Sequence, residues 1–237
     1  MKKADKRILV ISDLHIPYHH RDAFKFLAAI KKKFNPTRII NIGDEVDNHA
    51  ISFHDSDPDL MSAGDELKAA QKACAGLKKI FPKMQLVHSN HGSLLYRRGK
   101  AGGIPKWMLR DYQDVLGVGD DWEWFEEIHV GIGKQDIFFR HQFKANILKA
   151  AEEYGCCVVQ GHYHSKFEIA YTSSPRALNW GMSVGCLIDK KALAFAYNKT
   201  QTKRPILGIG LIENGQPRIV PMIVDKDGNW DGKLYNV

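Results

Sequence analysis

Five short apolar runs in this sequence are each followed within a few residues by aspartate, asparagine or histidine. The first run, residues 8–11, is rich in branched side chains and is typical of a buried strand. The polar residues behind the five runs are Asp13 and His15, Asp44 and Asp47, Asn90 and His91, His141, and His162 and His164. This repeated order of strand and polar group constrains the fold more than any other feature of the chain.

Helical segments alternate with the apolar runs. Residues 22–34 have apolar side chains near helical spacing, with Asp22 in the position of a cap. Helices are predicted over 22–34, 67–80 and 144–154, and strands over 7–12, 38–42, 84–88, 137–140 and 156–160. This alternation is typical of a mainly parallel sheet, in which ligands bind at the carboxyl ends of the strands. We therefore expect the polar residues to converge on one crevice.

Two segments depart from the alternation. Residues 92–127 mix glycine, basic and aromatic residues, and we interpret them as an insertion that covers the site. From residue 192 the pattern becomes antiparallel, because apolar runs flank Asn214-Gly215, a strong hairpin signal. These strands are expected to complete a second sheet. No linker rich in serine, glycine or proline divides the chain, so residues 1–237 are expected to form a single domain.

The composition argues against several classes of protein. No apolar run approaches the roughly 18 residues that span a bilayer, and the run behind the basic N-terminus is too short for a signal peptide. We therefore expect a cytoplasmic protein with no membrane partner. The four cysteines lack CxxC spacing, which argues against a disulfide framework or a zinc-thiolate site. The net charge of +7 favours a polyanionic partner such as nucleic acid, although solubility alone would explain it.

The polar residues are of types that bind divalent metal ions. Carboxylate, imidazole and amide groups suit Mn²⁺, Fe or Zn²⁺. Residues i and i+2 of an extended segment face the same side, so Asp13 and His15 can reach one metal together. One carboxylate can also bridge two cations about 3.5–4 Å apart. The sequence therefore predicts a two-metal site.

The order of these motifs resembles the calcineurin-like metallophosphoesterase family. The motifs are Asp-x-His, Gly-Asp-x-x-Asp, Asn-His, a single His and Gly-His-x-His, and they run from Asp13 to His164. The resemblance implies an α/β fold, a four-layer α-β-β-α sandwich, and we expect a phage or bacterial member. It implies one metal held by Asp13, His15, Asp44 and His164, and a second held by Asp44, Asn90, His141 and His162. Mn²⁺ is the expected metal, with Fe, Zn²⁺ and Ni²⁺ as alternatives.

The same resemblance implies a mechanism. By that resemblance, a hydroxide between the metals would attack phosphorus in line, His91 would give a proton to the leaving oxygen, and Asp47 would orient His91. The family usually writes its third motif as Gly-Asn-His followed by an acid, whereas Ser89 and Gly92 flank Asn90-His91 here. This departure leaves the predicted ligands in place and affects the tuning of His91.

We interpret the chain as a phosphodiesterase or nuclease acting on a nucleotide or nucleic acid. Arg97 and Arg98 lie in a segment with stacking aromatic residues, and Arg140 precedes His141, so all three are candidates for contact with substrate. The alternatives are a serine/threonine protein phosphatase, a small-molecule phosphomonoesterase, and an inactive scaffold with the same fold. Such scaffolds typically lack one or more ligands, and here every predicted ligand position is filled.

Taken one at a time, the motifs have ordinary explanations. Asp13 alone would suit a helix cap, and Asp44 alone would suit a turn. A single histidine such as His141 is more often packed in the protein interior than bound to a metal. The charged residues of 92–127 would equally suit a solvated loop. The metal site is favoured because these explanations give no reason for five motifs in this order. His49 and His54 are secondary candidates for contact with substrate.

Overall fold

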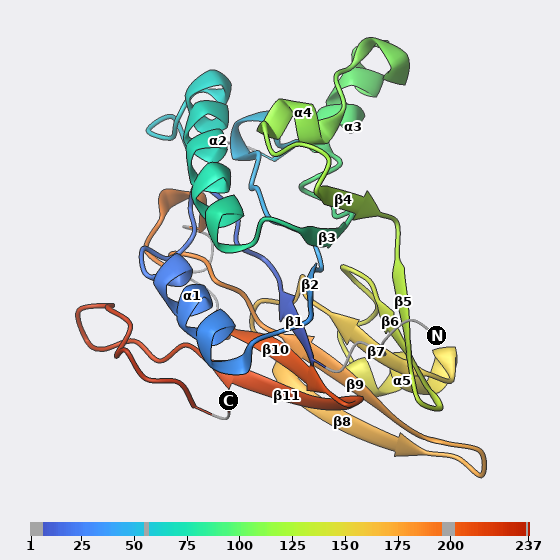
Figure 1. The fold of residues 1–237 in the computed structure, drawn as a ribbon. Helices are drawn as coiled ribbons and strands as arrows, with labels where there is room; N and C mark the ends of the chain where they lie inside the picture. Colours follow the sequence, from blue (N-terminus) through green and yellow to red (C-terminus); the bar gives the residue numbers. More distant parts are fainter. Residues whose placement is uncertain (1–6, 55–56, 196–201, 236) are drawn as a thin grey trace.

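Two β-sheets packed face to face form the centre of the fold (Figure 1). The computed structural model describes residues 7–54, 57–195, 202–235 and 237. Within these residues the first sheet has six strands in the order β11-β10-β1-β2-β3-β4, and the second has five in the order β5-β6-β7-β9-β8. The first sheet consists of β1 (Arg7–Ile11), β2 (Arg38–Asn41), β3 (Met84–Val87), β4 (Trp122–Phe125), β10 (Gly208–Glu213) and β11 (Gln216–Pro221). The second consists of β5 (Ile128–Ile132), β6 (Gln135–Phe139), β7 (Cys157–Gln160), β8 (Phe167–Ser173) and β9 (Leu178–Val184).

Helices cover the outer faces of both sheets. Helices α1 (Ala23–Phe34) and α2 (Ala63–Ile80) lie on the first sheet, and α5 (Ile147–Tyr154) packs on β7, β8 and β9 of the second. The short helices α3 (Leu94–Ala101) and α4 (Tyr112–Leu116) lie beyond β4 at the top of Figure 1. Two 3₁₀ turns, η1 (His49–Ile51) and η2 (Lys106–Met108), complete the described helical elements. The predicted four-layer α-β-β-α sandwich is therefore confirmed.

Three hydrophobic cores separate the four layers, and β1 shows how its sequence serves two of them. Ile8 and Val10 are fully buried between the two sheets, whereas Leu9 and Ile11 are fully buried against α1 and α2. Successive side chains of a strand point to opposite faces, so a strand covered on both faces needs a continuous apolar run. A third, smaller core lies between α5 and the second sheet.

The direction of the strands determines where the site forms. Strands β1, β2, β3 and β4 run parallel, as do β6, β7 and β9 in the second sheet. The carboxyl ends of parallel strands meet at one edge of a sheet, and loops that follow them can share a crevice. The polar motifs follow β1, β2, β3, β6 and β7.

Two expectations about the sheets were wrong. The C-terminal strands do not complete the second sheet, because β10 pairs antiparallel with β1 and extends the first. The β8–β9 hairpin, which the sequence analysis missed, occupies the edge of the second sheet instead. The segment 92–127 is also not wholly an insertion, since β4 pairs parallel with β3 and belongs to the first sheet.

The ends of the helices differ in detail from those predicted. Helix α2 begins at Ala63, where the Ser62 side chain accepts a hydrogen bond from the Asp65 amide. Asp22 was expected to cap α1, but its carboxylate instead accepts from Lys25 at 2.9 Å and from the Trp230 amide at 3.2 Å. Across the part of the chain that is described, none of the helices has the length and apolar character needed to cross a membrane.

Candidate metal centre

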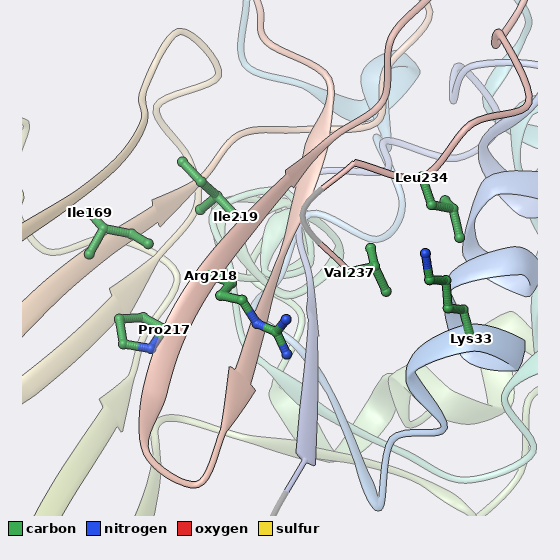
Figure 2. A pocket seen from close by; sticks show the side chains of 7 residues that line it. All are labelled: Lys33, Ile169, Pro217, Arg218, Ile219, Leu234 and Val237. Carbon is green, nitrogen blue, oxygen red and sulfur yellow. The ribbon is translucent and has the colours of Figure 1, made fainter.

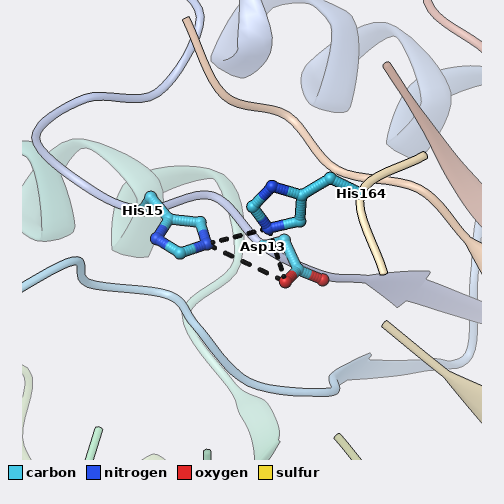
Figure 3. A group of neighbouring side chains, drawn as sticks. All are labelled: Asp13, His15 and His164. Carbon is cyan, nitrogen blue, oxygen red and sulfur yellow. Dashed lines mark hydrogen bonds and ion pairs between the residues drawn. The ribbon is translucent and has the colours of Figure 1, made fainter. Parts of the chain in front are cut away.

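One group of potential ligands combines the end of β1 with the loop that follows β7 (Figure 3). His164 Nε2 lies 3.1 Å from Asp13 Oδ1 and 3.1 Å from His15 Nε2. His15 Nε2 lies 3.8 Å from Asp13 Oδ1. The three ligand atoms all lie within 4.8 Å of one another, which is close enough for one metal ion to contact each of them.

A second group joins the loops behind β2, β3, β6 and β7. The ligand atoms of Asp44, His141 and His162 lie within 4.8 Å of one another. His141 Nε2 is 2.8 Å from Asn90 Oδ1 and 3.3 Å from Asp44 Oδ2. The structure therefore brings together all four residues that the family resemblance assigns to a second metal.

Asp44 lies between the two groups. Its Oδ2 atom is 3.3 Å from His141 Nε2 in the second group and 3.5 Å from His15 Nε2 in the first. It is only 2% exposed, so both contacts are shielded from water. A single carboxylate within reach of two ligand groups is the arrangement expected of a bridging ligand.

Two of the predicted ligands, His15 and His141, are buried and are fixed through their other ring nitrogens. His15 Nδ1 lies 2.5 Å from Asp47 Oδ1, and His141 Nδ1 donates to the Ile42 carbonyl at 2.9 Å. Metal-binding histidines usually donate their second N–H to a carboxylate or a carbonyl, which fixes the tautomer and the ring orientation. In both residues the nitrogen left for a ligand bond is Nε2, the atom that faces the rest of the group.

The backbone at these positions is unusual. Among the described non-glycine residues, positive φ angles occur at Asp13 (50°), His15 (48°), Asp44 (50°), His162 (62°) and three asparagines. Asparagine adopts this left-handed conformation easily, and aspartate and histidine adopt it less often. Such conformations cost on the order of 1–3 kcal/mol each and concentrate at functional sites. Four of the seven coincide with predicted metal ligands.

Two glycines allow the loops to approach one another. A Cβ at residue 43 would lie 2.6 Å from the Ser89 Cβ and 2.9 Å from His141 Nδ1. A Cβ at residue 161 would overlap Ser12 Oγ and Asp13 Oδ2. Both glycines therefore keep open the space in which the ligand loops meet.

The carboxylates and histidines of the site shift one another's pKa values. Burial opposes ionisation of Asp13, but hydrogen bonds from His15 and His164 outweigh it and hold its pKa below the ordinary value of 3.8. Burial also lowers the pKa of His141, but the charge of Asp44 outweighs this effect and raises the pKa to about 9. The pKa of His15 is likewise raised well above 6.5, because its bonds to Asp13 and Asp47 outweigh burial. Carboxylates that hold protons on two histidines would also favour a bound cation.

His91, the predicted proton donor, lies at the edge of the first group. Its Nδ1 atom donates to the backbone carbonyl of Asp47, and its ring centroid is 4.7 Å from that of His15. The Asp47 carboxylate, expected to orient His91, lies nearer to His15: Oδ1 is 2.5 Å from His15 Nδ1 and 3.3 Å from His91 Nδ1. Asp47 therefore contacts both histidines. His15, Asp44 and His91 also form a third group of metal-binding type.

The predicted substrate contacts are less closely grouped. Arg98 donates to the carbonyls of Ile51 and Ser52, with its guanidinium 4.1 Å from the Phe53 ring, so it holds the loop after η1. The Arg97 guanidinium is 5.1 Å from the same ring. Arg140 is exposed beside His141.

The two secondary candidates differ in position. His49 is close to the centre, since its Nδ1 atom lies 3.5 Å from Asp47 Oδ2. His54 is exposed, and its amide donates to the Ser52 side chain. Only His49 is therefore placed near the predicted ligands.

Two residues that the sequence motifs did not single out as functional support the loops. Ser89 Oγ accepts from the amides of Asp44 (3.0 Å) and Gly92 (3.1 Å), so it joins the β2 and β3 loops. Glu66, 3% exposed on α2, accepts from the His49 amide at 2.7 Å and the Ala50 amide at 2.8 Å. Ser89 was visible as a departure from the family motif, whereas Glu66 carried no signal in the sequence.

The donor set fits divalent cations. Carboxylate, imidazole and amide groups meet at the site, and three histidines, His15, His141 and His164, present their Nε2 atoms to the carboxylates. This combination suits Mn²⁺, Fe or Zn²⁺, and the described groups include no cysteine. The site can therefore bind a metal of this class.

Comparisons with known proteins agree with the fold. No family model matches the chain, and no curated protein matches it in sequence. Among solved structures, Vps29 from Chaetomium thermophilum superimposes with a TM-score of 0.50 and 13% identity, covering 95% of this chain and 94% of that chain. The chain also matches an archaeal phosphodiesterase (TM-score 0.45, 16% identity, 91% and 99% covered) and YfcE, a phosphoesterase from E. coli (0.43, 12%, 95% and 96%). At these identities the likeness concerns the fold alone.

Proposed function

We propose that this protein is a two-metal-dependent phosphoesterase that hydrolyses phosphodiesters of nucleotides or nucleic acid. The position of Asp44 carries the proposal, because its Oδ2 atom is within 3.5 Å of ligand nitrogens from both groups. A carboxylate shared in this way is typical of hydrolases that use two metals. Such sites hydrolyse phosphate esters by stabilising both the attacking and the leaving oxygen.

The two cations would be held by overlapping sets of residues. The first set is Asp13, His15, Asp44 and His164, and the second is Asp44, Asn90, His141 and His162. Mn²⁺ is the metal we propose, and Fe, Zn²⁺ and Ni²⁺ suit the same donors. When bound, cations of this class polarise phosphoryl oxygens and lower the pKa of water.

The protein's own contribution to the chemistry is positioning and proton transfer. Because His91 Nδ1 donates to the Asp47 carbonyl, Nε2 is the nitrogen that can give a proton to the leaving oxygen. Asn48 donates to the His91 carbonyl at 3.1 Å and so holds its backbone as well. These two contacts fix both the ring and the backbone of His91.

The substrate preference rests on charge. The chain has a net charge of +7, Arg97 is exposed on α3, and Arg140 is exposed directly before the predicted ligand His141. Exposed cations near a metal site favour a polyanion, and their contribution falls as salt rises. These residues favour a nucleotide or nucleic acid over a phosphoprotein.

Metal analysis and a panel of esters test the proposal. The metals of the purified protein are removed with a chelator and restored with Mn²⁺, and hydrolysis of bis-p-nitrophenyl phosphate, p-nitrophenyl phosphate, cyclic nucleotides and single-stranded DNA is measured. We expect Mn²⁺-dependent hydrolysis, with diesters cleaved faster than the monoester. Metal binding without hydrolysis of any ester would identify a scaffold. Faster hydrolysis of the monoester or of phosphoproteins would overturn the substrate class.

A further inference from the structure

A cavity of about 650 Å³ opens beside Asn90, one of the predicted metal ligands. It lies between the loop after β3, the helices α3 and α4, and the edge strand β4. Its volume falls within the range of about 300–1,000 Å³ that is typical of small-molecule sites. Part of any substrate held at the metal centre could therefore occupy this space.

Another cavity, of about 630 Å³, lies between the β10–β11 hairpin and Lys33 of α1 (Figure 2). It includes none of the predicted ligands. Its arginine, Arg218, is already paired with Glu213 at 2.7 Å. Of these two cavities, the one beside Asn90 is placed to contact a substrate at the proposed centre.

One wall of the cavity beside Asn90 is aromatic and held in place from behind. The Tyr112 and Trp124 rings meet edge to face, with centroids 5.5 Å apart. Trp124 Nε1 donates at 3.3 Å to the carboxyl of Glu45, which is 1% exposed, and the Tyr112 hydroxyl accepts at 3.3 Å from the side chain of Asn48. A wall fixed in this way loses little conformational freedom when a planar group binds to it. Tyr96, 43% exposed on α3, contributes a third ring to the lining.

The charged groups of the lining balance one another. Lys106 and Arg110 contribute two positive charges, and Asp111 and Glu126 contribute two negative charges. A site for a second phosphate would need an excess of cations. A balanced set with several hydrogen-bonding groups suits a neutral polar group, and the aromatic wall suits a planar one.

We infer that this cavity binds the nucleoside of a nucleotidyl ester, with the scissile phosphate at the adjacent metal centre. The inference rests on the proposed phosphoesterase function and specifies its substrate class. The base would stack on the wall formed by Tyr112 and Trp124, and polar lining groups such as Gln113 and Glu126 would bond the sugar and the base. The phosphate would lie beyond Asn90, at the ligand groups.

Two esters with the same leaving group test this inference. One is the p-nitrophenyl ester of thymidine 5′-phosphate and the other is methyl p-nitrophenyl phosphate, which lacks a nucleoside. We expect the wild-type kcat/KM to be at least tenfold higher for the thymidine ester. Gln113→Trp, which places a large side chain in the cavity, should reduce the ratio of the two kcat/KM values by more than tenfold. Tyr96→Ala, at an exposed position, should reduce it several-fold, and Lys100→Ala, on the same helix but outside the lining, should leave it unchanged.

Calorimetric binding separates failure of this inference from failure of the proposed function. Thymidine 5′-phosphate and methyl phosphate are titrated into wild type and Gln113→Trp. The cavity assignment stands, even if no ester is hydrolysed, when two results are found together. Thymidine 5′-phosphate must bind wild type at least tenfold more tightly than methyl phosphate, and Gln113→Trp must remove this difference. Equal affinity for the two ligands, or a preference that survives both Gln113→Trp and Tyr96→Ala, overturns it. Tight binding of single-stranded DNA without any preference for the nucleotide also overturns it.

Discussion

The Nε2 atoms of His15 and His164 lie 3.1 Å apart, and both belong to the group around Asp13. Two ring nitrogens at this distance repel unless a proton or a cation lies between them. The other nitrogen of His15 is bonded to Asp47, which leaves Nε2 for that role. The same position can therefore hold a proton in the metal-free protein and a metal in the loaded one, so metal affinity and pH are linked.

We expect the metal-free protein to lose stability as pH rises above 6.5. Its folded state raises the pKa of His141 from 6.5 to about 9, and that of His15 in the same direction. A raised pKa stabilises the fold fully below 6.5, and the contribution is lost as pH rises through the folded value, at up to about 1.4 kcal/mol per pH unit per proton. Melting curves in chelator between pH 6.5 and 9 measure this loss.

The stabilisation of the fold by Mn²⁺ should increase as pH rises, whereas the stability of the metal-free protein should decrease. Metal must displace the protons on the histidines, so the rise in Tm on adding Mn²⁺ should be larger at pH 8.5 than at pH 6.5. His141→Gln should flatten the pH dependence in chelator. A Tm in chelator that stays constant from pH 6.5 to 9 would contradict the linkage.

Asp44→Asn should weaken both metal sites. The change removes a charge from an atom that lies within 3.5 Å of both His15 and His141. Loss of supporting residues typically costs about 10–100-fold in metal affinity, and a shared ligand should cost at least as much at each site. Calorimetric titration with Mn²⁺ measures both affinities, with Asp120→Asn as an exposed control. If only one of the two Mn²⁺ affinities falls, Asp44 is a ligand of a single metal and not a bridge.

Gly161→Ala should disturb the centre without changing a ligand. The added methyl group would overlap the side chains of Ser12 and Asp13, and overpacking of this kind costs about 1–3 kcal/mol. We expect a lower Tm and weaker Mn²⁺ binding. Gly131→Ala is the matched control, because no atom lies within 4 Å of its added Cβ. Equal effects of the two changes would show that Gly161 has no particular role at the site.

Most of the candidate metal centre could be predicted from short motifs in the sequence. Asp13, His15 and Asp44 directly follow the carboxyl ends of their strands, so sequence order predicted that they would meet. Strands β1 and β2 were also predictable, because their apolar runs are covered on both faces.

Pairing between distant segments was not predictable in the same way. Nothing in the sequence of β10 specifies β1 as its partner, since antiparallel pairing at a sheet edge depends on which edge is free. Strand β8 carries mostly half-buried side chains, so its apolar signal is weak. The contacts of Asp47 and Arg98 depend on loop conformations, and spacing along the chain does not determine those conformations.

Arg97 and Arg98 should behave differently when each is replaced by alanine. Arg98 holds the carbonyls of Ile51 and Ser52, so Arg98→Ala should lower Tm by about 2–4 °C, the shift that about 1 kcal/mol produces in a chain of this size. Arg97→Ala should leave Tm unchanged and raise KM for single-stranded DNA. The affinity for single-stranded DNA is measured at several salt concentrations. If Arg97→Ala removes one phosphate contact, the slope of log affinity against log salt concentration should become shallower by about 0.7. An unchanged slope would remove Arg97 from the substrate contacts.

His91→Ala should keep both metals and lose activity in a way that depends on the leaving group. Proton donation by a positioned histidine typically contributes about 10²–10⁴-fold, and an alkoxide needs that proton far more than p-nitrophenolate does. Hydrolysis of an unactivated dinucleotide should therefore fall by about this factor, and that of bis-p-nitrophenyl phosphate should fall much less.

Asp47→Asn is the informative comparison, because the Asp47 carboxylate lies 2.5 Å from His15 Nδ1. Asp47→Asn should therefore weaken metal binding as well as activity. Equal losses on the two diesters would exclude His91 as the acid, and loss of one metal equivalent from His91→Ala would instead make it a ligand beside His15 and Asp44.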